Sequence, residues 1–403
     1  MHDFLENIRI LDLSRLLPGQ YTTSLLADLG AEIVMVEHPA HGNPSRHRPP
    51  KIDGRGAAQL LRDRGKRSVA IDLKDDRGRE ACLSLAASAD VVLEGFRPGT
   101  ADRLGVGYDD VREANEEVVY CSLTGYGQDG PYSERPGHDI NYIGIGGLLS
   151  LTGEQDGQPT VPGYPIADLA GALYASTAIT AALAGRAGEP VHLDVSMADV
   201  VASFSMTYAD RLLGGSESPK RGETVLTGYH PGYRVYQAAD GKLLTIGALE
   251  DRFWKNLCTA TDLESISDEN VDFSSDVDES KQEALVEMLA ATIAERPRDE
   301  WLQIFDEHDV PAGPVNDFEE IFSDPHLRKR GLFEETGSEE SEDHWSAKEL
   351  AFKHTFGDRG DRTKKDAPSC GEDTETLLSS IGYDPETIEA LAAHGVIKTA
   401  TDR

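Results

Sequence analysis

Hydrophobic and polar residues in the first half of the chain follow a pattern that predicts alternating strands and helices. A short apolar run at 9–13 is followed by a loop at 14–20, and residues 21–29 then show helical spacing of apolar positions until Gly30. Residues 32–37 form a second apolar run. This order is typical of a βαβ unit. Such a unit predicts a parallel sheet whose ligand site opens at the carboxyl ends of the strands.

The same alternation continues along the chain as far as about residue 213. Glycine, proline and charged residues lie between the apolar runs and separate each run from the next. We expect strands at 68–73, 90–94, 118–123 and 190–195, and helices at 77–89, 169–183 and 198–213. The fold class that follows is α/β, with a doubly wound parallel sheet.

The pattern changes after residue 229. A β-hairpin is predicted at Tyr233–Gly247, with Asp240-Gly241 at its turn, and helices follow it. We therefore expect a second, smaller domain of α+β type, and a final helix at 385–394. The expected division is a large domain at 1–213, a linker at 214–228, the small domain at 229–330 and a C-terminal segment at 331–403.

The charge and composition of the chain argue against some classes of binding partner. The 403 residues carry a formal net charge of −33, and acidic clusters such as Glu339 to Asp343 occur along the whole chain. Binding to nucleic acid or to an anionic membrane would need a concentrated basic surface, so neither partner is expected. The acidic composition suggests a high-salt cytoplasm and a halophilic source. The N-terminus lacks the basic start and apolar core of a signal peptide, so we expect a cytoplasmic protein.

Cysteine and glycine patterns exclude several common sites. The four cysteines are far apart and form no CxxC or Cys/His pair, and HExxH is absent, so no metal site or disulfide framework is expected. The GxGxxG and GxxxxGK[ST] motifs are absent as well. Their absence disfavours a nicotinamide-dependent dehydrogenase and a P-loop NTPase.

Two residues in the stretch 122–186 are candidates for catalysis. Asp168 precedes an alanine-rich helical run that ends at Gly185, so it lies at or near the start of a helix. It either caps that helix, or serves as a nucleophile or base whose ionised form is favoured by the positive helix end. His138 follows a Pro-Gly turn and is either a structural histidine or a general acid/base.

Basic residues cluster after the predicted strand ends, although the chain as a whole is strongly acidic. They are either ordinary surface charges or cations that bind a phosphorylated ligand, and we favour the second interpretation. The cluster consists of Arg46, Arg48, Arg64, Lys66, Arg67, Lys74, Arg97 and Arg103.

Several segments, in order, resemble the family III CoA-transferases and the related α-methylacyl-CoA racemases. They span most of the chain and are specific in combination. The matching segments are ILDLSRLLPGQYTTSLLADLGAEIVMVEHP (10–39), KRSVAIDLK (66–74), DVVLEGFRPGTADRLGVGY (90–108), YCSLTGYGQDGPYSERPGHDINY (120–142), PIADLAGALYA (165–175), AADGKLLTIGALEDRFW (238–254) and VPAGPVNDFEEIFSDPHLRKRG (310–331).

The resemblance implies a fold, an assembly and a coenzyme A site. It implies a Rossmann-like large domain built from the N-terminal part and the returning C-terminal segment, with the small domain inserted and two chains interlocked as a homodimer. Coenzyme A thioesters would be substrates, with no permanently bound cofactor. Lys74 and Arg103 would contact the CoA phosphates, Phe96 and Leu104 the adenine end, and Arg97 is also expected to contact CoA. Gly95 departs from the asparagine that the family often has at that position.

The resemblance implies one of two chemistries. In the transferases the carboxylate at Asp168 attacks an acyl-CoA thioester, forming an aspartyl anhydride and then an enzyme-CoA thioester, with backbone donors near Gly144, Gly146 and Gly147 for the oxyanion. In the racemases His138 and Asp168 exchange the α-proton of a 2-methylacyl-CoA, and Glu250 orients the histidine.

GHDINY at 137–142 and GALE at 247–250 match the racemases, whereas PIADLAGALYA, TGYHPGY at 227–233 and VPAGPVND are closer to the transferases. We therefore predict a CoA-transferase, with the racemase as the alternative. The partners would be an acyl-CoA such as succinyl-CoA and a small carboxylic acid, for instance a dicarboxylate such as mesaconate. His138, His230 or Arg46 would contact a distal carboxylate. An acyl-CoA-binding protein without catalysis is a further alternative, which Asp168→Ala would distinguish.

Overall fold

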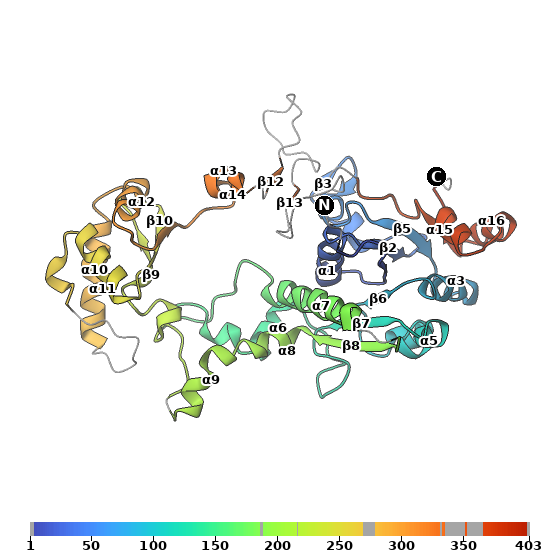
Figure 1. Cartoon of the computed structure of the whole chain (residues 1–403), viewed down its shortest axis with the longest axis horizontal. Coiled ribbons are helices and arrows are strands. Elements are labelled where there is room, and N and C mark those ends of the chain that lie inside the picture. The colour runs from blue at the N-terminus through green and yellow to red at the C-terminus, as the bar shows by residue number, and fades with distance from the viewer. Residues whose placement is uncertain are drawn as a thin grey trace. The chain divides into compact units, whose positions relative to one another are not determined.

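The computed structural model describes residues 4–185, 188–215, 217–268, 279–330, 333–334, 351–352 and 366–400. It divides into two compact units, shown in Figure 1. Unit 1 contains Met1–Gly146, Gly163–Phe204 and Lys329–Arg403, and unit 2 contains Gly147–Pro162 and Ser205–Arg328. Residues 147–162 and 205–213, expected in the large domain, thus group with unit 2. The acidic cluster at 339–343 lies outside the described residues.

A seven-stranded sheet forms the centre of unit 1. Its order is β14 (Ile397–Lys398), β5 (Arg67–Ile71), β2 (Glu32–Glu37), β1 (Arg9–Asp12), β6 (Val91–Glu94), β7 (Val119–Thr124) and β8 (Val191–Ser196). All neighbouring strands are parallel except β14, which is antiparallel to β5. The α/β class and its parallel sheet are therefore confirmed. The middle positions of the central strands are apolar because both faces of the sheet are covered. All four residues of β6 are buried, including Glu94 at its end.

Successive strands of the chain are added on opposite sides of β1 before and after the crossover to β6. From β1 the chain proceeds through β2 to β5 on one side, and then crosses back to β6, β7 and β8 on the other side. Right-handed crossovers then require helices on opposite faces before and after the reversal. The loops that follow β1 and β6 diverge at this point, which is where ligands bind in open α/β sheets.

Two groups of helices pack on this sheet. The helices α1 (Leu17–Asp28) and α7 (Ile166–Gly185) pack against each other; α1 contacts β1 and β2, and α7 contacts β7 and β8. In the other group, α3 (Asp76–Ala86) and α15 (Thr374–Ser380) pack on β5, and α5 (Tyr108–Ala114) packs on α3. These helices share a core with α16 (Pro385–Ala393). Helix α1 begins four residues earlier than expected, because Pro18 in its first turn needs no N–H partner.

The helix expected at 198–213 is two helices, so this prediction was wrong. α8 (Met197–Ser203) buries Met197, Ala198, Val200 and Val201 and belongs to unit 1. α9 (Met206–Leu213) has no buried residue and belongs to unit 2. The sequence between them contains no helix breaker, so the break follows from tertiary packing and not from local propensity.

Unit 2 is built on an antiparallel sheet of β9 (Tyr233–Gln237), β10 (Leu243–Gly247) and β11 (Ala312–Pro314). The predicted hairpin is confirmed, and Gly241 at its turn has a φ of +78°. Three helices complete the core of this unit: α10 (Asp251–Ala260), α11 (Glu279–Ile293) and α12 (Arg298–Glu307).

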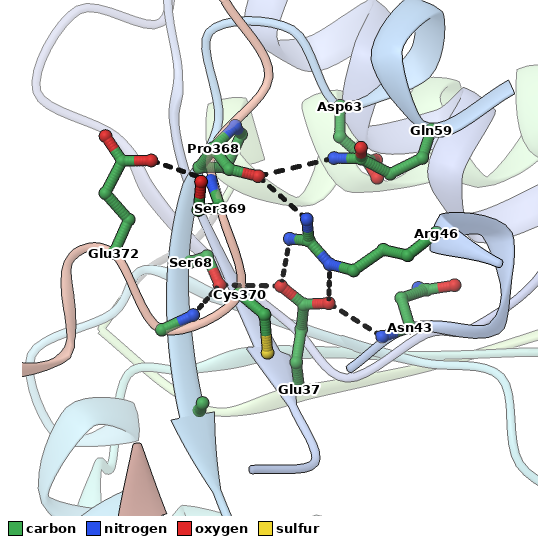
Figure 2. A network of polar contacts seen from close by, with 12 residues as sticks. Glu37, Asn43, Arg46, Gln59, Asp63, Ser68, Pro368, Ser369, Cys370 and Glu372 are labelled. Carbon is green, nitrogen blue, oxygen red and sulfur yellow. Dashed lines mark hydrogen bonds and ion pairs between the residues drawn. The ribbon is translucent and has the colours of Figure 1, made fainter. Parts of the chain in front are cut away.

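The C-terminal segment joins the sheet of unit 1 through a buried polar network (Figure 2). Arg46, at the end of η1 (Pro44–Arg46), forms an ion pair with Glu37 at the end of β2 and donates to the carbonyl of Pro368 at 2.8 Å. Ser68 in β5 donates to Glu37 at 2.6 Å and accepts from the backbone N–H of Gly371 at 2.9 Å. The network therefore connects two strand ends with a chain segment about 300 residues away in sequence.

Among the described residues, one helix is long and apolar enough to cross a membrane, by length and composition alone. This helix is α7. The core helix of a folded unit passes the same test, and α7 packs on α1, α8 and β7 within unit 1.

Candidate active site

Asp168 lies in the first turn of α7, but another residue caps this helix. Oδ1 of Asp139, the first residue of α6 (Asp139–Ile145), accepts hydrogen bonds from the backbone N–H groups of Ala167 at 2.6 Å and Asp168 at 3.1 Å. Among the described residues, no group donates a hydrogen bond to the Asp168 carboxylate. The capping role, which the sequence left open for Asp168, is therefore filled by Asp139, and the Asp168 side chain is available for chemistry.

The surroundings of Asp168 raise its pKa to about 6. Burial is the largest cause, and the negative charge of Asp139 adds to it, whereas His138 and Arg62 act in the opposite direction. The effects of burial and Asp139 on the pKa thus outweigh those of His138 and Arg62. At neutral pH the carboxylate is still mostly ionised, but it is less well solvated than a surface carboxylate.

Asp168 and His138 line the same cavity in unit 1, which has a volume of about 480 Å³. The loops that follow β1, β6 and β7 form its walls, together with the loop that enters α6 and with Met197 of α8. Gly95, Phe96, Arg97 and Tyr142 also line it. The cavity therefore opens at the carboxyl ends of the strands, as the βαβ pattern predicted.

Tyr142 is held in this cavity wall by two glycines. A Cβ on Gly125 would lie 2.4 Å from Cε1 of the Tyr142 ring, and a Cβ on Gly137 would lie 2.6 Å from the same atom. Burial raises the pKa of Tyr142 to about 12, and the nearby Asp168 contributes. The phenol is therefore neutral at physiological pH, and it lines the same cavity as the Asp168 carboxylate.

A second cavity in unit 1, of about 90 Å³, shares Arg15 and Phe96 with the first. Lys74 and Leu104 line it, and so do His38 and His41, whose ring centroids are 4.0 Å apart and stacked. The Arg15 guanidinium lies 5.0 Å from the centroid of the Phe96 ring. Of the five predicted CoA contacts, four (Lys74, Phe96, Arg97 and Leu104) line at least one of these two cavities.

The remaining predicted residues lie elsewhere. Arg103, in α4 (Thr100–Leu104), lines neither cavity and donates to Thr100 at 2.8 Å. Arg46 is bound to Glu37 and Pro368. Gly144, Gly146 and Gly147 do not line the cavity of Asp168, and a Cβ on Gly146 would lie 2.5 Å from Cγ1 of Val201, which indicates a packing role.

Two predicted site residues belong to unit 2. His230 is buried, its Nδ1 accepts from the backbone N–H of Gly232 at 2.9 Å, and its ring meets Trp254 edge to face at 6.3 Å. Glu250 precedes α10 and makes no side-chain capping bond.

Sequence reasoning missed several residues of the site. Arg15 and the His38–His41 pair come directly after the ends of β1 and β2. This position was the only feature of the sequence that could have identified them as residues of the site. The cap formed by Asp139 on α7 depends on a tertiary contact, for which the sequence gives no signal. No group of three His, Cys, Asp or Glu residues suited to a metal ion occurs in the part of the chain that the structure describes.

Comparisons with known proteins agree with this architecture. The family model of CoA-transferase family III matches residues 5–374. The chain is 34% identical to succinyl-CoA:glutarate CoA-transferase of Mus musculus, covering 98% of this chain and 90% of the relative. It is 33% identical to succinyl-CoA:mesaconate CoA-transferase of Haloarcula marismortui, covering 95% and 98%.

A racemase and a solved structure match as well. Alpha-methylacyl-CoA racemase of Homo sapiens is 33% identical, with 98% of each chain covered. The crystal structure of a CAIB/BAIF family protein from Brucella suis superimposes with a TM-score of 0.76 at 30% identity, covering 94% of this chain and 99% of that one.

Proposed function

The chain belongs to CoA-transferase family III, and from this premise we propose that it transfers CoA from succinyl-CoA to a small dicarboxylic acid through covalent intermediates on Asp168. The observation that carries the proposal is the state of the Asp168 carboxylate. It lines a cavity at the carboxyl ends of the strands, it accepts no hydrogen bond from the described residues, and another carboxylate caps its helix. These are the properties of a nucleophile and not of a structural carboxylate.

The first half-reaction exchanges the acyl group for CoA on the enzyme. An Asp168 oxygen attacks the thioester carbonyl, the C–S bond breaks, and the CoA thiolate leaves behind an acyl-aspartyl anhydride. The thiolate then attacks the aspartyl carbonyl of this anhydride, which releases the donor acid as a carboxylate and forms an Asp168-CoA thioester. No net proton is gained or lost in these two steps.

The second half-reaction runs the same chemistry in reverse with the acceptor. The acceptor carboxylate attacks the Asp168 thioester, which gives a new anhydride and free thiolate. The thiolate then attacks the acceptor acyl carbon, forming the new acyl-CoA and regenerating the Asp168 carboxylate. The neutral Tyr142 beside Asp168 and the low solvation of the site disfavour attack by water.

The two cavities, which share Arg15 and Phe96 in their walls, suit the two ends of an acyl-CoA. In our proposal Lys74, Phe96 and Leu104, with His38 and His41, bind the nucleotide end, and Arg15 and Arg97 neutralise the diphosphate. The acyl end then reaches the cavity of Asp168, which shares Arg15 and Phe96 with the nucleotide cavity.

The acid pair is proposed from the relatives. Two of them are named for transfer between succinyl-CoA and glutarate or mesaconate. Succinyl-CoA as the donor and a four- or five-carbon dicarboxylate as the acceptor are therefore the first pair to test. In this reaction His138 would be a substrate contact.

Racemisation is the second candidate, because His138 and Asp168 line one cavity as an acid/base pair would require. One relative of equal coverage is named as a racemase. Uptake of deuterium at the α-carbon of a chiral 2-methylacyl-CoA, without exchange of acids, would favour this candidate.

We also propose that the protein is a homodimer. Large apolar side chains on α6, α7 and α8 or at their ends are exposed in the single chain, among them Ile145, Leu173, Tyr174 and Phe204. Burial of such a surface against a second copy would stabilise both chains. Light scattering that gives the mass of one chain at micromolar concentration would contradict the proposal.

The function is tested by incubating the enzyme with succinyl-CoA and a panel of free acids, and by identifying acyl-CoA products by mass. Formation of glutaryl-CoA or mesaconyl-CoA by the wild type, and its loss in Asp168→Asn, is the expected result. Release of free CoA without any new acyl-CoA would contradict the function.

A further inference from the structure

Tyr142 is a buried tyrosine in the wall of the Asp168 cavity, and its side chain is only 7% exposed. In the part of the chain that the structure describes, its hydroxyl has no hydrogen-bond partner. The O–H of a buried phenol normally donates to a neighbouring group. Tyr120, another buried tyrosine of unit 1, donates in this way to the carbonyl of Val106 at 3.0 Å. The unpaired hydroxyl of Tyr142 therefore points to a partner that enters the cavity.

The ring of Tyr142 is held in one position by close packing. A Cβ on Gly125, which also lines the cavity, would lie 2.5 Å from the Tyr142 hydroxyl oxygen. The Tyr126 ring meets the Tyr142 ring edge to face, with ring centroids 5.0 Å apart. The hydroxyl thus has a fixed place at the cavity wall before a ligand binds, which is the property that makes a hydrogen-bond donor effective in catalysis.

A hydrogen bond at the start of α6 orients Tyr142 towards the helix of Asp168. Oδ1 of Asp139, the first residue of α6, accepts from the backbone N–H of Asp168 at 3.1 Å. Tyr142 follows Asp139 by three residues, and side chains at this spacing are neighbours on one face of a helix. The Tyr142 ring therefore leaves α6 on the face that contacts the start of α7.

The proposed transfer requires a donor for a carbonyl oxygen. When an Asp168 oxygen attacks the thioester carbon, the π electron pair of the carbonyl moves to its oxygen, and this pair returns when the C–S bond breaks. A neutral O–H stabilises the transient oxyanion by a hydrogen bond and keeps its own proton. The three glycines that the sequence suggested for this role do not line the cavity; they are Gly144, Gly146 and Gly147.

We propose that the Tyr142 hydroxyl is the oxyanion donor of this site and hydrogen-bonds the carbonyl oxygen of the bound acyl-CoA. This inference rests on the proposed function and adds a catalytic residue to it. The acyl-aspartyl anhydrides present the same kind of carbonyl oxygen, so the contact serves both half-reactions. Burial raises the pKa of Tyr142 to about 12, which keeps the phenol protonated and able to donate.

Tyr142→Phe removes the hydroxyl and keeps the ring. We expect kcat for CoA transfer from succinyl-CoA to glutarate to fall about 100-fold, the effect typical of losing one oxyanion donor. The affinity for a CoA thioether, which has no carbonyl oxygen, should not change. The melting temperature should not fall either, because this hydroxyl has no hydrogen bond within the described residues to lose.

Tyr120→Phe is the matched control. It removes a buried hydroxyl that bonds to the carbonyl of Val106, and Tyr120 lines neither cavity. This substitution should lower the melting temperature and leave kcat at the wild-type value. The two variants therefore distinguish a catalytic hydroxyl from a structural one.

Ser14→Ala and Tyr126→Phe test competing donors, because both residues carry a hydroxyl and line the same cavity. A wild-type kcat in Tyr142→Phe, weaker binding of the thioether by this variant, or a loss of kcat confined to Ser14→Ala or Tyr126→Phe would overturn the assignment.

Infrared spectroscopy tests the contact without turnover. In Asp168→Asn, the carbonyl stretch of bound, isotope-labelled succinyl-CoA should move to higher frequency when Tyr142→Phe is added, because a hydrogen bond weakens the C=O bond. An unmoved stretch would overturn the contact. If Tyr142→Phe does not fold, replacement of Tyr142 by difluorotyrosine decides: its more acidic phenol should move the alkaline limb of kcat to lower pH, and an unmoved limb would count against the donor role.

The wild type separates this inference from the proposed function. Failure of the wild type to transfer CoA to any acid would overturn the proposed function and the role of Tyr142 with it. Transfer by the wild type, with undiminished transfer by Tyr142→Phe, would overturn the oxyanion assignment alone.

Discussion

Asp139 caps helix α7, and the Asp168 carboxylate in the first turn of the same helix lines the cavity. Asp139 accepts the backbone hydrogen bonds at the start of α7, one of them from the N–H of Asp168 itself at 3.1 Å. Its negative charge, together with burial, raises the pKa of Asp168 to about 6. The residue that caps the helix thus also raises the pKa of the proposed nucleophile.

Asp139→Asn should separate the two effects of Asp139. Asparagine keeps the Oδ1 acceptor, so the helix cap persists, but the loss of charge should lower the pKa of Asp168. The acid limb of the pH profile of kcat/KM for acyl-CoA should therefore move to lower pH. Asp139→Ala should in addition lower the free energy of unfolding by about 1 kcal/mol, because the cap is lost. An acid limb that does not move in Asp139→Asn would show that this charge does not act on Asp168.

Asp168 should limit activity on the acid side and reduce stability at neutral pH. Its pKa is raised from 3.8 to about 6 on folding, so the folded state favours the protonated form. The resulting destabilisation is fully present above about pH 6 and disappears as the pH falls towards 4. Activity should fall as the pH drops through about 6, because the protonated acid is not a nucleophile.

Asp168→Asn should therefore be inactive but more stable than the wild type at pH 7. The gain should shrink at pH 4, where the wild-type carboxyl is largely protonated. Thermal unfolding at both pH values measures it. Equal stability of the two proteins at pH 7 would contradict the raised pKa.

Gly137→Ala should disturb the cavity wall. The added Cβ would lie 2.6 Å from the ring of Tyr142 and 3.0 Å from the hydroxyl of Tyr126, so the loop before His138 must shift. We expect kcat to fall at least tenfold, since displacements of about 1 Å at a reacting centre have large effects. Gly144→Ala, whose Cβ would meet no atom within 4 Å, is the control and should be close to wild type in kcat. Equal kcat values for the two variants would contradict the steric account.

The Glu37–Arg46 pair should be structural. Burial acts to raise the pKa of Glu37, but hydrogen bonds from Arg46, Ser68 and Asn43 lower it overall, so the stabilisation is present at neutral pH and lost as the pH falls through this lowered value. Glu37→Gln leaves the Arg46 charge buried without its partner and should lower the free energy of unfolding by about 3–5 kcal/mol. Lys255→Gln, which breaks an exposed pair with Asp251, should lower it by less than about 1 kcal/mol. Similar effects of the two substitutions in denaturant titrations would contradict the role of the buried network.

The sequence was sufficient to predict the strands, because the buried parallel strands contain short apolar runs between turn residues, such as Val91 to Leu93 in β6. It also singled out Asp168 at a helix start and His138 after a Pro-Gly turn, and the family resemblance pointed to the same two residues. Their catalytic roles stay predictions. It did not predict the break between α8 and α9, which depends on which face each helix buries. Nor did it predict the commitment of Arg46 to Glu37. Which cation pairs with which anion is decided by contacts between segments distant in sequence, and residue identity alone does not encode it.

The proposed CoA transfer requires a covalent intermediate at Asp168. The decisive measurement is the mass of the protein after incubation with succinyl-CoA alone, followed by peptide mapping. A mass increase equal to CoA minus water, located on Asp168 and absent from Asp168→Asn, is the predicted result. No adduct on Asp168, combined with deuterium incorporation at the α-carbon of a 2-methylacyl-CoA in deuterated water, would contradict CoA transfer and establish an acid/base pair with His138.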